Sequence, residues 1–330
     1  MKYKNIFSAA FLAMAAFVGF NSCDTDPETE VVQDLYKYDS QYFENLRAWK
    51  QSPHEVSYAY YASYSNTMTP TSWGERIIGL PDSLDIVNLW GDVPTMESNP
   101  IAYEDMVYCQ KTKGTRFVLH ADAAHYNHYV WARTYNEAKG EFEYEYDAAG
   151  NHILIKTEAD KPETIIYYAR WAVDTLVQCG IDGVDFDYEG WNGTNITIVA
   201  EECDKYIGPN GKWPEKLFII DWFNGAPPAE TEPFTDYYVR QAYSWQIGFQ
   251  TGSGGRPIER TILCESTGAE SADGGVNGAM VREYAAWEPA TGHKGGFGAY
   301  YIDYNYKSQS GIPYKEYREA IQIQNPAVHK

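Results

Sequence analysis

The pattern of apolar and polar residues divides this chain into short strand-like runs that alternate with longer helix-like segments. After residue 50, apolar runs of strand length are separated by turn residues and cover residues 55–64, 84–90, 116–120, 182–189, 217–222, 237–245, 261–264 and 297–302. Apolar residues recur at helical spacing between Pro162 and Gly180, and residues 314–324 predict a last helix. This order predicts an α/β fold, a single-domain (β/α)8 TIM barrel over residues 51–330.

One segment of the chain does not fit a minimal barrel. Residues 141–146 and 152–156 both alternate apolar and polar side chains, and residues 147–151 between them read Asp-Ala-Ala-Gly-Asn. Alternation on both sides of such a turn predicts a β-hairpin. It would lie between the third strand and its helix, on the face where barrels carry active sites. We interpret it either as a wall of the substrate cleft or as an ornament on the rim.

The N-terminal residues 1–22 have the pattern of an export signal rather than of a barrel element. A basic start is followed by an apolar run over residues 6–20 and by small residues before Cys23, and the run is short for a membrane span. The segment resembles a bacterial lipoprotein signal peptide, which implies that Cys23 is lipidated and that residues 23–50 are a tether and N-terminal extension. The expected location is the outer membrane, at the cell surface or on the periplasmic face. A plain secretory peptide is the alternative.

The overall charge and the cysteines narrow the function classes. The formal net charge of −20 disfavours a nucleic-acid partner, which requires basic patches. None of the cysteines forms a CxxC pair, so the spacing of zinc ligands is absent. Apart from Cys23, the remaining cysteines could form one disulfide, but buried free thiols are favoured. The group of His120, Asp122, His125 and His128 lacks a fixed metal-ligand motif, and we interpret these residues as loop contacts.

The run of residues 182–189 carries the chemistry of the chain, because three carboxylates occupy every second position. On a strand, Asp185, Asp187 and Glu189 point to one face, while the apolar residues between them point to the other. Crowding and burial raise the pKa of carboxyl groups, which suits a general acid that works near neutral pH. The pattern predicts Glu189 as the general acid above two supporting aspartates. Asp182 has the wrong parity and is expected to support the strand entry.

A solvated acidic edge strand and a cation site are the alternatives for this run. The apolar and aromatic residues between the carboxylates argue against a solvated edge. Calcium sites more often come from a loop with carbonyl ligands and a glycine turn. Catalysis is therefore the favoured interpretation.

The spacing Asp-x-x-Asp-x-Asp-x-Glu at the end of a strand resembles the signature of glycoside hydrolase family 18, the chitinases and endo-β-N-acetylglucosaminidases. The resemblance implies a (β/α)8 barrel whose fourth strand the motif closes, and a substrate-assisted retaining mechanism without metal or cofactor. In that mechanism the 2-acetamido oxygen of the substrate attacks the anomeric carbon. Glu189 would protonate the leaving oxygen and later activate water. Asp187 would orient the acetamido N–H, and Asp185 would hydrogen-bond Asp187.

Residues on the sixth and eighth strands extend the resemblance. Gln241 and Tyr243 share a face, and family members place a tyrosine here whose hydroxyl holds the acetamido carbonyl. A glutamine two residues earlier resembles the endo-β-N-acetylglucosaminidase branch, whereas many chitinases carry Met-x-Tyr-Asp and this chain has Ser244 instead of the aspartate. Strand eight carries Tyr-Tyr-Ile-Asp where chitinases usually have a tryptophan, and Tyr301 is a candidate floor for the sugar. The alternative is that Gln241 and Tyr243 are two polar residues packed inside the barrel.

Aromatic residues are abundant at 16%, and sugar faces stack on such rings. The candidates for sugar contact are Trp90, Trp191, Trp222 and Asn224. Trp191 lies two residues after the proposed acid, and Asn224 follows the fifth strand. Core packing is an equal alternative for Trp222.

The combined expectation is an endo-β-N-acetylglucosaminidase that cuts the di-N-acetylchitobiose core of N-glycans. Its partners would be an N-glycan or another N-acetylglucosamine-containing glycan, the membrane through Cys23, and glycan-uptake proteins. A chitinase acting on N-acetylglucosamine oligomers is one alternative. A non-catalytic surface glycan-binding protein on the same fold is the other.

Overall fold

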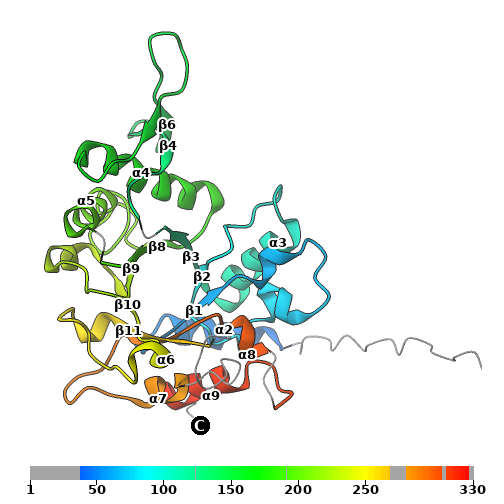
Figure 1. The fold of residues 1–330 in the computed structure, drawn as a ribbon. Helices are drawn as coiled ribbons and strands as arrows, with labels where there is room; N and C mark the ends of the chain where they lie inside the picture. The colour runs from blue at the N-terminus through cyan, green and yellow to red at the C-terminus, as the bar shows by residue number, and fades with distance from the viewer. Residues whose placement is uncertain (1–37, 123, 191, 268–279, 307–309, 327–330) are drawn as a thin grey trace, which may run out of the picture. The chain divides into compact units, whose positions relative to one another are not determined.

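A closed barrel of eight parallel strands forms the centre of the computed structural model (Figure 1). The structure describes residues 38–122, 124–190, 192–267, 280–306 and 310–326, and these belong to one compact unit. Around the barrel the strands are β1 (Val56–Tyr61), β12 (Gly296–Tyr300), β11 (Thr261–Ser266), β10 (Tyr237–Gln241), β9 (Leu217–Trp222), β8 (Gly183–Tyr188), β3 (Arg116–Ala121) and β2 (Ile86–Leu89). Each of the eight predicted strands is present, and the (β/α)8 prediction is confirmed.

Alternate residues of the barrel strands supply two separate apolar layers. One layer fills the barrel interior and includes Val56, Tyr58, Ile86, Val118, Leu217, Ile219, Val239, Ile262 and Cys264. The other lies between the strands and the helices, and includes Phe117, Val184, Phe186, Phe218, Ile220, Leu263 and Phe297. A Cβ atom on Gly298 would lie 3.0 Å from the carbonyl oxygen of Tyr58. Glycine there leaves room for the tyrosine inside the barrel.

Helices surround the barrel and connect its strands (Figure 1). They are α2 (Ser40–Lys50), α3 (Pro100–Tyr108), α4 (Pro162–Cys179), α5 (Gly193–Cys203), α6 (Ser244–Ile247), α7 (Val281–Ala286), α8 (Asp303–Tyr306) and α9 (Lys315–Gln324). Short helical turns cover Ser63–Asn66, Trp73–Glu75, Ile77–Gly79, Cys109–Lys113, Ala229–Phe234 and Ile258–Arg260. Helix α4 ends at Gly180, whose positive φ of 66° favours glycine. Among the described helices, none is both long and apolar enough to cross a membrane.

Helix α2 contacts the barrel, although it lies within the range 23–50 that was expected to be a tether and N-terminal extension. The Lys50 ammonium group donates to the Leu84 carbonyl oxygen at 2.6 Å and to the Thr115 hydroxyl at 2.9 Å. Arg47 donates to the carbonyl oxygen of Thr112 at 2.7 Å. The compact unit therefore begins at Tyr38 rather than at residue 51.

A small β-structured arm is inserted between β3 and α4. Its strands are β4 (Tyr129–Trp131), β5 (Arg133–Asn136), β6 (Glu141–Tyr144) and β7 (Leu154–Lys156), and β4 pairs with β7 while β5 pairs with β6. The predicted hairpin between residues 141–146 and 152–156 is therefore only partly right. A single bridge, Tyr146 to His152, joins those two segments around the predicted turn. The remaining pairing is with residues 129–136.

The cysteines of the described region are free thiols, at Cys109, Cys179, Cys203 and Cys264. Three are buried, and Cys179 is partly exposed. This agrees with the preference for thiols over a disulfide. Burial raises the pKa of the Cys264 thiol well above its usual range, so it behaves as an apolar side chain of the barrel interior.

Candidate active site

Strand β8 presents its carboxylates to the barrel interior, as the alternation of the sequence predicts. Asp185 is completely buried, Asp187 is partly exposed above it, and Glu189 follows the end of the strand. Val184 and Phe186 belong to the layer beneath the helices. In this fold the active site lies at the C-terminal ends of the parallel barrel strands. The three carboxylates thus rise through the barrel interior toward its mouth.

Asp185 lies at the base of this column and is held by neutral donors from the first two strands. The Tyr58 hydroxyl donates a short hydrogen bond to its Oδ2, and the Asn88 amide donates to the same oxygen at 2.8 Å. Its Oδ1 is buried without a protein partner in the described part of the chain. Burial raises the pKa of Asp185 well above its usual range, and the nearby Asp221 carboxyl adds to the effect.

A second aspartate, Asp221 at the end of β9, lies beside Asp187. Asp187 and Asp221 share a hydrogen bond. The Gln241 amide on β10 joins them, because its Nε2 donates to Asp221 Oδ1 at 2.8 Å and lies 3.2 Å from Asp187 Oδ1. The Tyr60 hydroxyl donates to Asp221 Oδ2 at 2.6 Å. Strands β1, β8, β9 and β10 therefore contribute to one buried network of hydrogen bonds.

The network holds protons at neutral pH. The pKa of Asp187 is raised to about 6: burial is the largest cause and the neighbouring carboxylates of Glu189 and Asp185 act in the same direction, while hydrogen bonds with Asp221 and Gln241 partly offset them. Burial raises the pKa of Asp221 well above its usual range, and the Asp187 charge and their shared hydrogen bond act in the same direction. A protonated Asp221 that donates to an ionised Asp187 satisfies both groups.

Aromatic rings surround the mouth of the barrel above the acidic column. Tyr243 lies between Phe223 and Tyr300, with ring centroids 5.9 and 5.5 Å away and nearly parallel planes. Tyr301 packs on Tyr300 at 4.1 Å, and both rings lie 5.3 Å from the exposed indole of Trp90. The arrangement offers flat apolar faces to a ligand that enters the mouth.

His120 on β3 completes this side of the mouth. Its Nδ1 lies 3.3 Å from the Asn88 amide nitrogen, and its ring is 6.4 Å from that of Trp90. Burial lowers the pKa of His120 to about 4. The imidazole is therefore neutral at physiological pH.

Comparison with known proteins places this arrangement in a family. The model described as glycoside hydrolase family 18, BT1044-like, matches residues 22–266, well over half of the chain. The chain belongs to glycoside hydrolase family 18.

Individual relatives agree with the family. The endo-β-N-acetylglucosaminidase F2 of Elizabethkingia meningoseptica is 25% identical over 288 residues, which cover 78% of this chain and 76% of that protein. A solved structure of BT1044 has a TM-score of 0.60 at 18% identity and covers 89% of this chain and 94% of that one. The endo-β-N-acetylglucosaminidase of Cordyceps militaris, in complex with fucosyl-N-acetylglucosamine-Asn, has the same TM-score and identity and covers 89% and 98%. The protein is thus a glycoside hydrolase.

In this family 18 barrel, some of the supporting residues lie where the sequence predicts them and others do not. Gln241 and Tyr243 both face the interior, as their parity indicates. Asp182 lies at the start of β8, where it accepts from the Phe117 backbone N–H at 2.9 Å and from the Gln110 amide at 2.8 Å. It supports the strand entry, away from the acidic column.

The expectation of a sugar contact at Trp222 is corrected by the structure. Trp222 belongs to the layer between strands and helices, only 4% exposed, with the Arg240 guanidinium 5.2 Å above its ring. Asp221, not Trp222, is the inward residue at the end of β9. Asn224 is exposed, and its carbonyl lies beside Gly190, next to the proposed acid. Trp191 and Cys23 lie outside the described residues.

Tyr300 and Tyr301 together occupy the region of the mouth where Tyr301 alone was expected. Tyr300 is the interior residue of β12 and stacks on Tyr243, while Tyr301 follows the strand with a positive φ of 58°. Tyr301 remains at the mouth, in contact with Trp90.

The sequence interpretation missed Tyr58, Tyr60, Asn88, Asp221 and Tyr300 as members of the family 18 site. They share one signal, a polar or phenolic side chain with inward parity near the end of an otherwise apolar barrel strand. Reading each strand for such residues would have found Tyr58 and Tyr60, the two tyrosines of β1 that share the inward face.

Proposed function

We propose that this family 18 enzyme is an endo-β-N-acetylglucosaminidase that cleaves the β-1,4 bond between the two sugars of the N-glycan core. The observation that carries the proposal is the hydrogen-bonded set of Asp187, Asp221 and Gln241 beneath Glu189. A glutamine at this place resembles the endo-β-N-acetylglucosaminidase branch of the family. The similarity to endo-β-N-acetylglucosaminidase F2 over most of the chain supports the same activity.

The proposed reaction is substrate-assisted. The acetamido oxygen of the sugar on the non-reducing side attacks its own anomeric carbon, and the bond to the leaving oxygen breaks as Glu189 gives that oxygen its proton. The product is an oxazolinium ion. Glu189, now a carboxylate, removes a proton from water, and this water attacks the anomeric carbon and opens the ring. The configuration at the anomeric carbon is retained because it is displaced twice.

Asp187 is the residue that the acetamido group requires. Its anion accepts the acetamido N–H, turns the acetamido oxygen toward the anomeric carbon, and lies beside the positive charge of the oxazolinium ion. The Tyr243 hydroxyl would donate to the acetamido oxygen, and the position of its ring at the mouth, between those of Phe223 and Tyr300, supports this role. Asp221 and Gln241 hold Asp187 in this orientation through their hydrogen bonds.

Glycan release from glycoproteins of high-mannose, hybrid and complex type tests the proposal, with chitin oligomers as the contrasting substrate. The wild type is expected to release glycans and to leave one N-acetylglucosamine on the protein. The Glu189→Gln variant should bind the same glycans but lose roughly 10²- to 10⁴-fold in kcat, the range for a lost general acid. Hydrolysis of chitin oligomers without glycan release would identify a chitinase. Glycan binding by the wild type without any cleavage would identify a binding protein.

We also propose that the enzyme is anchored to the outer membrane through a lipid on Cys23. The basic, apolar and small-residue pattern of residues 1–22 supports this. A Cys23→Ser variant should move from the membrane fraction to the soluble fraction, and unchanged membrane association would contradict the anchor.

A further inference from the structure

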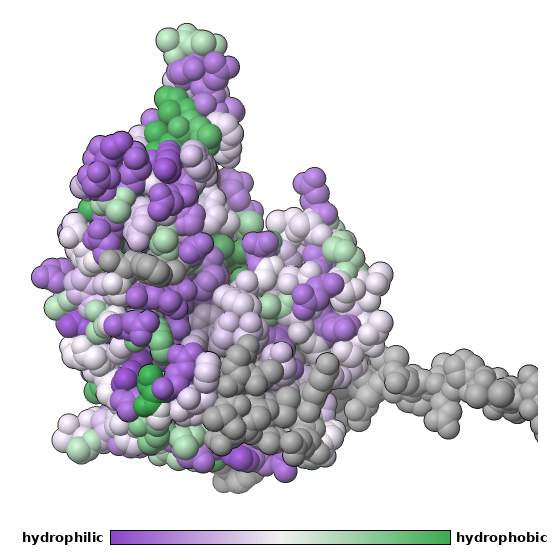
Figure 2. All heavy atoms as spheres, viewed as in Figure 1, coloured by the Kyte–Doolittle hydropathy of each residue, from purple (hydrophilic) through white to green (hydrophobic). Residues whose placement is uncertain are grey.

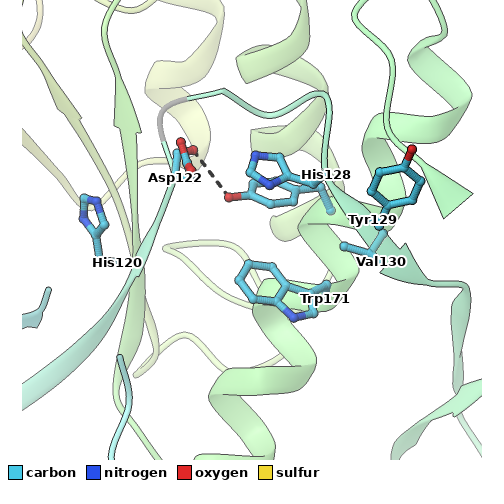
Figure 3. A pocket seen from close by; sticks show the side chains of 7 residues that line it. His120, Asp122, His128, Tyr129, Val130 and Trp171 are labelled. Carbon is cyan, nitrogen blue, oxygen red and sulfur yellow. Dashed lines mark hydrogen bonds between the residues drawn. The ribbon is translucent and has the colours of Figure 1, made fainter. Parts of the chain in front are cut away.

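A cavity opens at the end of β3, beside the acidic column. It has a volume of about 390 Å³, within the range of small-molecule sites, and its walls include His120, Asp122, His128, Tyr129, Tyr168 and Trp171 (Figure 3). We call it the β3 pocket. His120 pairs in register with Asp185 on the neighbouring strand. The pocket therefore begins one strand away from the strand that carries Glu189.

One wall of the β3 pocket is a stack of three aromatic rings. The His128 imidazole lies parallel to the Tyr168 ring at 4.6 Å, and Tyr168 lies parallel to Trp171 at 5.3 Å. Hydrogen bonds to the loop after β3 fix two of these rings. His128 bonds to the Ala124 carbonyl, and the Tyr168 hydroxyl donates to the Asp122 carbonyl oxygen at 3.4 Å. The apolar wall is thus formed before any ligand arrives.

The rim of the β3 pocket carries polar groups that are open to a ligand. The Asp122 side chain is exposed, and Tyr129 is 66% exposed on β4. Figure 3 shows both at the edge of the pocket. A carboxylate and a phenol next to an aromatic wall suit a pyranose, whose C–H face packs on rings while its hydroxyl groups bond to polar atoms.

The exposed face of the arm continues from the pocket. Trp131 and Leu154 lie directly opposite each other on β4 and β7, and both are exposed. Tyr144 and Tyr146 extend this face around His152. Figure 2 shows apolar atoms gathered on the same projecting arm. A bound oligosaccharide would therefore meet apolar rings beyond the pocket as well as inside it.

We propose that the β3 pocket binds a neutral hexose in an arm of the substrate glycan, beyond the sugars at the cleaved bond. The inference rests on the proposed function. A neutral sugar fits better than an acidic one, because the pocket offers the Asp122 carboxylate and a neutral His120, and its described lining residues include no lysine or arginine. The pocket thereby selects glycans by the sugar that ends or branches the arm.

Two glycopeptides separate this role from catalysis: one with a complete asialo biantennary glycan, and one with only the two core N-acetylglucosamines. Tyr129→Ala is expected to raise KM for the complete glycan roughly tenfold, the equivalent of about 1.4 kcal/mol, with kcat unchanged and the short substrate unaffected. Tyr108→Ala on α3, an exposed tyrosine at 40%, is the matched control and should change neither. Equal effects of Tyr129→Ala on both substrates, or no effect on either, would overturn the proposal.

The preference for a neutral arm is tested by binding. Glu189→Gln protein should bind the asialo glycopeptide several-fold more tightly than its sialylated form, and Asp122→Asn in that background should reduce the ratio. An unchanged ratio argues against the pocket as the point of selection. Because binding is measured without turnover, it separates the two proposals. If the wild type cleaves no glycopeptide but Tyr129→Ala still weakens binding, the proposed function fails and the pocket assignment stands.

Discussion

Replacing Asp221 by asparagine or by leucine tests whether this buried carboxyl group carries a proton in the resting enzyme. Asp221 receives hydrogen bonds from Tyr60 at 2.6 Å and from Gln241 at 2.8 Å, and it shares one with Asp187. If Asp221 is protonated, its O–H donates to Asp187 and stabilises the Asp187 anion. The pKa of Asp187, about 6, then already includes a lowering by this hydrogen bond.

The size of the effect follows from the strength of that hydrogen bond. A hydrogen bond to a charged acceptor is worth about 1.5–3 kcal/mol, which corresponds to roughly 1–2 units of pKa. In Asp221→Leu the donor is lost, so the pKa of Asp187 should rise, and the acidic limb of kcat/KM should move from about pH 6 to about pH 7–8. Asp221→Asn keeps a neutral N–H donor and should leave the limb near its original position.

The pH dependence of kcat/KM on one glycopeptide, measured for the wild type and both variants, decides the question. Were Asp221 ionised instead, both substitutions would remove a negative charge next to Asp187. The pKa of Asp187 would then fall, and the acidic limb would move to lower pH in both variants. A shift in that direction refutes the protonated Asp221. Thermal unfolding of each variant controls for loss of the fold.

Three further substitutions test the roles of single residues. Asp187→Asn should abolish turnover but stabilise the fold at high pH. The raised pKa of Asp187 means that the wild type has stability that is present below pH 4 and lost as pH rises through about 6. In denaturant unfolding, the variant should therefore exceed the wild type in free energy of unfolding by up to about 3 kcal/mol at pH 8 and not at pH 4. Trp222→Leu should lower stability by roughly 2–4 kcal/mol with KM unchanged, whereas Trp90→Ala should raise KM with little loss of stability. The opposite pattern would restore Trp222 to the sugar site.

Most of the barrel could be predicted from the sequence, because each barrel strand is a short apolar run between turn residues. The face of β8 was also predictable, since its charged and apolar residues alternate. On β9 both faces are apolar until Asp221, so the sequence around Trp222 does not reveal which face is inside. The inward position of Asp221 becomes clear only when its partners Tyr60 and Gln241 are brought beside it by the closed barrel.

The arm between β3 and α4 shows a second limit of local patterns. The turn at residues 147–151 predicts pairing between the segments on either side of it, and the turn is present. Strands β6 and β7 nevertheless pair mainly with residues 129–136, which are farther away in the sequence. Pairing over such distances depends on packing against α4, which no local spacing encodes.

The buried acids of the family 18 site are held without a cation, and this explains how they can serve the proposed reaction. Within the described residues, no ion pair involves Asp185, Asp187 or Asp221, and the side chains that hydrogen-bond to them are phenol, amide and carboxyl groups. A lysine at this place would neutralise Asp187 equally in the substrate complex and in the transition state. A proton on Asp221 instead leaves the negative charge on Asp187, where it has no counter-ion until positive charge develops on the sugar. The attraction therefore strengthens as the reaction proceeds, and an interaction of this kind lowers the barrier rather than only binding the substrate.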